Sequence, residues 1–220
     1  TGCYNFALEN YDNALEILLK LINLEHISNE NQLLLARTRD NVGSTCYKQE
    51  MYGRALEEHD YARKLREEFS SDDFESIVKS YSNIALDHLE IDKKYFPLAL
   101  ENCKKALKIA NEKHLAALHP ACAWAEISYG KYYFKTGKYD EAIEKYQRAL
   151  NIFEKALLNG HPDVAFAHLC LGQYYFKTKN YPEALQSDKK ALAIYTQQII
   201  QNDQDIKNCM YYIEQAENMQ

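Results

Sequence analysis

The stretch GHPDVA, residues 160–165, places a histidine and a carboxylate two residues apart. A histidine that is oriented by a carboxylate can transfer a proton, and the same two side chains can hold a metal ion. The His-Pro dipeptide recurs at His119, but there it is followed by Ala121 and Cys122, so the carboxylate is missing. A catalytic or metal centre would not be repeated without half of its ligands, and the recurrence therefore favours a structural role.

We expect that structural role to be the start of a helix. Proline is tolerated in the first helical turn, so Pro162 predicts a helix that begins there, with His161 at or beside its N-cap. Asp163 then lies in the first turn, where the helix dipole favours a carboxylate. The other histidines and cysteines lack a second ligand pair at metal spacing, and no glycine-rich phosphate loop is present. The sequence thus predicts a non-enzyme without cofactor or metal.

Composition points to a helical protein. The chain has 220 residues, of which 46% are hydrophobic, with only seven glycines and four prolines, too few turn-forming residues for an all-β fold. A net charge of -6 excludes a protein that binds nucleic acid through a basic face. No apolar run approaches the roughly 20 residues that span a bilayer, so we expect no membrane partner. Six cysteines without a CxxC pair are typical of reduced thiols in a cytosolic protein.

A repeated pattern covers most of the chain. Residues 130–153 match residues 172–195 at an offset of 42 residues, and both segments follow a His-Pro pair. The same register extends to 2–24 and 43–65, and a weaker copy at 85–109 has two extra residues between its halves. The chain starts inside the first unit and lacks an initiator methionine, so we expect a fragment of a longer protein.

Each of the five units carries small and aromatic residues at fixed places. Spacings of three, four and seven residues put these positions on one helical stripe, and small side chains let two antiparallel helices approach closely. Turn-forming stretches such as KTGKYD (135–140) and KTKNYP (177–182) separate the two halves of a unit, so each unit is predicted to be a helical hairpin. The opening small residues are Gly2, Gly43, Ala85, Gly130 and Gly172, and the central alanines are Ala14, Ala55, Ala99, Ala142 and Ala184.

The segment GKYYFKTGKYDEA resembles the tetratricopeptide repeat almost position for position. The 42-residue period and the His-Pro opening are most similar to the repeats of kinesin light chain and its relatives, although paired asparagines of that subfamily are replaced by Ile127-Ser128 and Leu169-Cys170. The resemblance implies an all-α, right-handed α-solenoid of five helical hairpins with a C-terminal capping helix. The implied repeats are 1–28, 31–70, 73–115, 120–158 and 162–201, and the cap is 203–220, which could also open a further, degenerate repeat.

The resemblance also implies a binding surface, because the first helix of each tetratricopeptide hairpin lines a concave groove. The residues that it assigns to this groove are Tyr47, Lys48, Trp124, Lys131, Phe134, Lys135, Gln173, Phe176 and Lys177. Such a row of aromatic and basic side chains suits a peptide or helix with an apolar anchor and acidic neighbours. Phe134 and Phe176 fit equally well as buried side chains between neighbouring hairpins.

The function implied by the resemblance is that of a non-catalytic scaffold for protein–protein interaction. One alternative is a structural subunit of a large motor or ciliary assembly. Another is a recruitment module of an enzyme whose catalytic domain lies outside this sequence. We expect a cytoplasmic protein, with association to the cytoskeleton or a cilium as a variant of the same interpretation.

Overall fold

The computed structural model describes residues 2–24, 28–113, 115, 118–197 and 203–219, and this part of the chain forms helices and no strand. The all-α class expected from the sequence is therefore confirmed. The chain divides into two compact units, residues 1–115 and 116–220. Within the described residues, no helix has the length and apolar character needed to cross a membrane.

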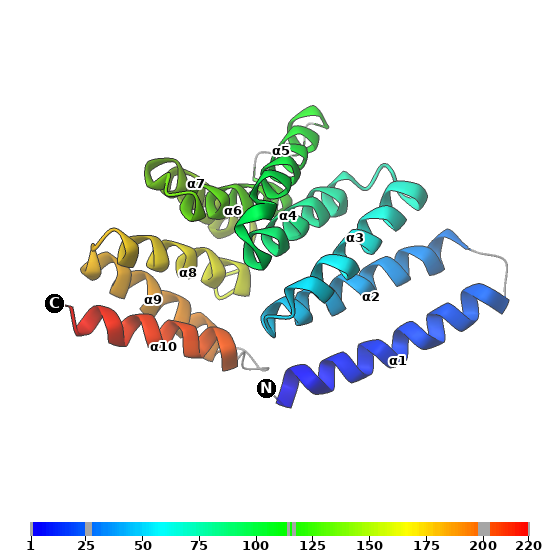
Figure 1. The fold of residues 1–220 in the computed structure, drawn as a ribbon, viewed down its shortest axis with the longest axis horizontal. Helices are drawn as coiled ribbons and strands as arrows, with labels where there is room; N and C mark the ends of the chain where they lie inside the picture. Colours follow the sequence, from blue (N-terminus) through cyan, green and yellow to red (C-terminus); the bar gives the residue numbers. More distant parts are fainter. Residues whose placement is uncertain (1, 25–27, 114, 116–117, 198–202, 220) are drawn as a thin grey trace. The chain divides into compact units, whose positions relative to one another are not determined.

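The first unit contains α1 (Gly2–Leu24), α2 (Asn29–Lys48), α3 (Tyr52–Phe69), α4 (Phe74–Ile91) and α5 (Phe96–Glu112). Helices α2 and α3 form one hairpin, and α4 and α5 form the next (Figure 1). A short 3-10 helix, η1 (Lys93–Tyr95), precedes α5 and accommodates the two extra residues of this repeat. Buried Leu35, Ala36, Val42, Cys46, Ala55 and Ala62 belong to the core of this unit.

The hairpin expected within residues 1–28 is wrong. The structure has one continuous helix there, α1, which packs on α2. Leu8 and Glu9 stand where the fourth repeat has its turn residues Thr136 and Gly137, and Leu8 is buried in the core, so nothing breaks the helix. Fewer than two helical turns of α1 precede this point, too little to form a stable arm of its own. The predicted boundaries at residues 1, 201 and 220 lie outside the described residues.

The second unit contains α6 (Pro120–Lys135), α7 (Tyr139–Ala156), α8 (Pro162–Lys177), α9 (Tyr181–Thr196) and α10 (Asp203–Glu217). Helices α6 and α7 form a hairpin, α8 and α9 form another, and α10 packs mainly on α9 (Figure 1). The core includes Ile127, Tyr146 and Phe153, and a smaller cluster of Leu169, Ala191, Tyr195 and Cys209 lies towards α10.

The glycines that open the repeats mark close helix contacts, as the spacing predicted. A methyl group added at Gly43 would lie 2.6 Å from the His59 ring, and one at Gly130 would lie 2.6 Å from the Tyr146 ring. A methyl group at Gly172 would collide with Oδ1 of Asp188. Each glycine therefore makes room for a side chain from the second helix of its own hairpin.

The two His-Pro pairs start helices, and the N-cap prediction for His161 is confirmed. Its Nδ1 accepts a hydrogen bond from the backbone N–H of Asp163 at 3.1 Å, at the start of α8. His119 caps α6 in the same way, with its Nδ1 3.2 Å from the backbone nitrogen of Ala121. The two histidines, whose type suggested proton transfer or metal binding, therefore accept hydrogen bonds from backbone N–H groups at the starts of helices.

Candidate functional site

The ends of α6 and α8 are built in the same way. The hydroxyl of Thr136 donates to the carbonyl of Tyr132 at 2.9 Å, and the hydroxyl of Thr178 donates to the carbonyl of Tyr174 at 3.0 Å. The chain then reverses through a left-handed residue, Gly137 in the first case and Lys179 in the second. This turn fixes where the last helical side chains point.

Aromatic pairs form across both turns. Phe134, at the end of α6, meets Tyr139, the first residue of α7, edge to face at 5.8 Å between ring centroids. Phe176 and Tyr181 repeat this contact at 5.7 Å. Both phenylalanines are half-buried, so each ring packs on its own hairpin while keeping one side open.

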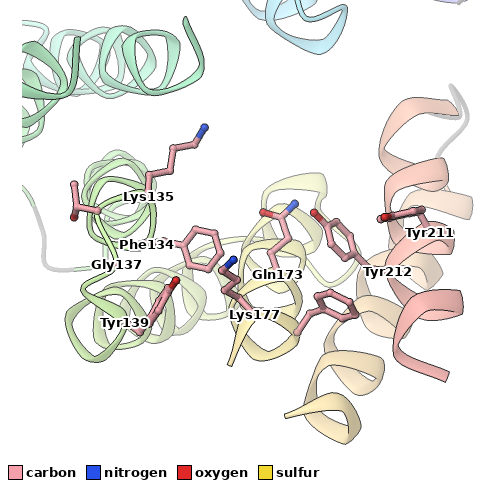
Figure 2. A pocket seen from close by; sticks show the side chains of 10 residues that line it. Phe134, Lys135, Gly137, Tyr139, Gln173, Lys177, Tyr211 and Tyr212 are labelled. Carbon is pink, nitrogen blue, oxygen red and sulfur yellow. The ribbon is translucent and has the colours of Figure 1, made fainter. Parts of the chain in front are cut away.

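The open sides of these rings face a hollow of about 660 Å³, which we call the aromatic pocket. Figure 2 shows Phe134 entering from α6, Gln173 and Lys177 from α8, and Tyr211 and Tyr212 from α10. The complete lining is Phe134, Lys135, Thr136, Gly137, Tyr139, Gln173, Phe176, Lys177, Tyr211 and Tyr212.

Helix α10 completes the aromatic pocket. Tyr212 meets Phe176 edge to face at 5.7 Å, and Tyr211 meets Tyr212 at 5.4 Å. Tyr211 is 57% exposed, so much of its ring is open to a ligand. The walls of the pocket come from α6, α7, α8 and α10, so its shape depends on the packing of α10 against α9.

The charge of the aromatic pocket is one-sided. Its charged lining residues are Lys135 and Lys177, and none of the described residues that line it is a carboxylate. Ammonium groups beside aromatic rings favour an anionic ligand group next to an apolar one.

Two of the predicted residues of the second unit lie in a different cluster. Trp124 donates its indole N–H to Oδ2 of Asp163 at 3.1 Å and packs against Phe166 at 5.3 Å. The Lys131 ammonium lies 5.7 Å from the centroid of the same Phe166 ring. These contacts join α6 to the start of α8, and neither Trp124 nor Lys131 lines the aromatic pocket.

The remaining predicted residues, Tyr47 and Lys48, belong to the first unit at the end of α2. Tyr47 meets Tyr52 edge to face at 5.3 Å, the same arrangement that Phe134 and Tyr139 form. The Tyr47 hydroxyl also donates to Oε1 of Glu90 at 3.5 Å. This turn repeats the geometry seen in the second unit without being part of the aromatic pocket.

Tyr211 and Tyr212 were missed by the sequence interpretation. Both lie in α10, which was interpreted as a cap or as the opening of a further, degenerate repeat, and no binding residue was predicted in it. The sequence did contain a signal, the Tyr-Tyr pair itself. Ile206, Cys209 and Ile213 already make up the apolar face that packs the helix on its neighbour, so two further large rings are more than a cap needs.

Within the described part of the chain, no group of three or more His, Cys, Asp or Glu side chains is arranged to hold a metal ion. The His161 and Asp163 side chains lie 3.9 Å apart, with His161 Nδ1 also accepting the capping hydrogen bond.

The fold and the turns identify the class of protein. The sequence profile of the tetratricopeptide repeat family matches residues 76–155 and 122–197, together more than half of the chain. The chain therefore belongs to the tetratricopeptide repeat family. No curated protein sequence matches it.

Solved structures with the same fold come from several settings. BtubC (BKLC) from P. vanneervenii superposes with a TM-score of 0.64 and 16% identity, over 98% of this chain and 90% of that one. Repeats from Podospora anserina, described as those of a kinesin light chain, have a TM-score of 0.56 and 16% identity over 86% and 87% of the two chains. NprR in complex with its cognate peptide NprX has a TM-score of 0.61 and 19% identity over 99% and 65%. At such identities the likeness shows the fold, an all-α solenoid of tetratricopeptide hairpins.

Proposed function

We propose that this chain is a non-catalytic interaction scaffold that binds a partner peptide or helix in the aromatic pocket of its second unit. The observation that carries the proposal is the lining of that pocket, five aromatic rings and two lysines without a carboxylate. NprR, which has the same fold, was solved with a bound peptide. A hollow of about 660 Å³ has room for a few side chains of a peptide.

The chemistry of the pocket selects the partner. Phe134, Phe176 and the two tyrosines of α10 offer apolar surface for an aliphatic or aromatic anchor. Lys135 and Lys177 favour acidic residues next to that anchor and speed up association with an acidic partner. We therefore propose a protein partner with an apolar anchor flanked by acidic residues.

A peptide-display selection with the whole chain tests this proposal. We expect the selected peptides to share an apolar residue beside one or more acidic residues. With such a peptide, Phe176→Ala should weaken binding by about thirtyfold or more, because aromatic anchors carry most of the affinity of an interface. Circular dichroism confirms that the variant keeps its fold.

A pair of charge reversals provides the matched control. Lys177→Glu should weaken binding and reduce its dependence on salt, because it removes a favourable charge from the pocket. Lys155→Glu makes the same charge change on the exposed end of α7, outside the pocket lining, and should leave binding unchanged. Equal losses in the two variants, or selected peptides without acidic residues, would count against the aromatic pocket as the binding site.

We also propose a cytoplasmic location. Cys46, Cys103, Cys122, Cys170 and Cys209 form no disulfide bond with one another, and all of these except Cys122 are buried, as expected in a reducing compartment. Fluorescence microscopy of the tagged full-length protein in its own cells is the test, and secretion of the protein would contradict the proposal.

A further inference from the structure

Asp188 of α9 is an isolated carboxyl group in the interior of the second unit. Its side chain is 0% exposed, and neither of its oxygens has a hydrogen-bond partner. It packs directly on the backbone of α8 at Gly172. A buried carboxylate without a partner is strongly unfavourable, so the uncharged form fits this place.

The corresponding positions of other repeats are filled differently. His59 occupies the place opposite Gly43, and its Nδ1 is 2.7 Å from Oδ2 of Asp87 in the next helix, α4. Tyr146 occupies the place opposite Gly130 and needs no charged partner. At Asp188 the repeat period puts Ala216 of α10 where α4 has Asp87, and Ala216 is fully buried.

An ion pair beside Asp188 and Ala216 connects α9 to α10. Lys189 follows Asp188 along α9, Glu217 follows Ala216 along α10, and Lys189 Nζ lies 3.1 Å from Oε1 of Glu217. The carboxyl group of Asp188 therefore lies at the level where α10 packs on α9.

Among the described residues, no hydrogen-bond donor or charged group compensates a negative charge on Asp188. The titratable side chains of α8, α9 and α10 that are buried or partly buried are Asp163, His168, Cys170, Tyr174, Tyr175, Tyr181, Tyr195, Asp205, Cys209 and Tyr212, and the lysines of these helices, Lys177, Lys189, Lys190 and Lys207, are exposed. Lys189 pairs with Glu217, and burial together with the charge of Lys190 lowers the pKa of His168 to about 4, so His168 is neutral near pH 7. Burial raises the pKa of Asp188 to about 7.

We propose that the protonation of Asp188 controls how firmly α10 packs on α9. In its uncharged form Asp188 allows α8, α9 and α10 to pack together, and in its charged form it loosens α10. Since Tyr211 and Tyr212 of α10 complete the aromatic pocket, the same proton also controls binding there, and this second part rests on the proposed function.

The sign of the pH dependence follows from the two states of the chain. An aspartate in the unfolded chain loses its proton near its ordinary pKa of 3.8, whereas the folded chain keeps it up to about pH 7. The stability that the proton supplies is therefore fully present below pH 3.8 and is lost as the pH rises to about 7. Above that pH the charged form predominates and α10 is held most weakly.

Hydrogen–deuterium exchange of the whole chain, followed in segments from residues 203–219, tests without any ligand whether the proton on Asp188 controls the packing of α10. After correction for intrinsic exchange rates, protection of α10 should fall by about tenfold between pH 6 and pH 8. Asp188→Asn should abolish this loss, and Asp188→Ala serves the same purpose if asparagine is not accommodated. Asp140→Asn, an exposed aspartate on α7, is the matched control and should behave like the wild type.

The outcomes separate the two parts of the proposal. If wild type and Asp188→Asn lose protection equally between pH 6 and pH 8, Asp188 does not control the packing of α10. A probe peptide from the display selection should bind more weakly at pH 8 than at pH 6 in the wild type and equally at both in Asp188→Asn. If α10 loosens as expected while no selected peptide binds at either pH, the control of α10 by Asp188 is supported and the proposed function fails.

Discussion

Single residues decide how each hairpin turns. The chain leaves the first helix through a left-handed residue in three repeats, and these residues are Glu50 with φ 63°, Gly137 with φ 80° and Lys179 with φ 63°. Glycine adopts this conformation without cost, whereas a residue with a Cβ is strained there. The turns at Glu50 and Lys179 therefore carry strain that the turn at Gly137 avoids.

Lys179→Gly should stabilise the second unit by about 0.5 to 1 kcal/mol, because relief of the left-handed strain outweighs the extra freedom of glycine in the unfolded chain. Urea unfolding measures the change. Lys155→Gly, at an ordinary helical position in the last turn of α7, is the control and should lose about as much stability as Lys179→Gly gains. A loss of stability at both sites would mean that the turn does not hold Lys179 in the left-handed region.

At the scale of helices, the repeat pattern predicted those elements whose sequence follows the pattern. The turns after Lys135 and Lys177 lie where KTGKYD and KTKNYP indicated, because their glycine, threonine and proline residues act locally. Helix α1 was predicted wrongly, since Leu8 and Glu9 continue a helix that the aligned register would have interrupted. Local residues decide a helix end, and the alignment alone does not.

The candidate site was predictable only in part, for a related reason. Phe134 and Lys135 recur 42 residues later as Phe176 and Lys177, and the structure brings these four residues together with Gln173 to one hollow. Trp124 and Lys131 recur less regularly, and their ring contacts direct them to a different cluster. Tyr211 and Tyr212 reach the hollow through the packing of α10, which no local pattern encodes.

The close contact of α8 and α9 at Gly172 can be tested with a substitution whose effect on the unfolding free energy depends on Asp188. Gly172→Ala should cost about 1 to 3 kcal/mol of unfolding free energy, because its methyl group would collide with the Asp188 carboxyl group. In an Asp188→Ala background the collision is gone, and the same change should be neutral or stabilising by up to about 1 kcal/mol, since alanine is the better helix former.

Gly53→Ala is the control for helix propensity in this comparison. Gly53 lies in α3, and a methyl group there would meet nothing within 4 Å, so this variant should gain stability in the wild-type background. Urea unfolding of the four Gly172 and Asp188 combinations yields the coupling energy. A Gly172→Ala cost that is the same in both backgrounds would contradict the contact between α8 and α9 as described.

At the scale of the whole molecule, repeat proteins draw their stability from neighbouring hairpins, and the described cores respect this rule. The buried cluster around Leu35 and Val42 belongs to the first unit, and the clusters around Tyr146 and Tyr195 belong to the second. The aromatic pocket and Asp188 also lie wholly within the second unit. The second unit therefore holds every element that the proposed function and its proton control require.

Residues 116–220 expressed alone should consequently fold and bind. We expect a helical circular dichroism spectrum, a cooperative melt, and affinity for a selected peptide within about threefold of the whole chain, because no lining residue comes from the first unit. A second fragment that ends at residue 197 removes α10 and is the matched control. It should lose most of the affinity together with the contacts of Tyr212 on Phe176, while α6 to α9 keep their helical signal. Full affinity in the shorter fragment would show that the peptide binds away from α10, and failure of residues 116–220 to fold would show that the two units depend on each other for stability.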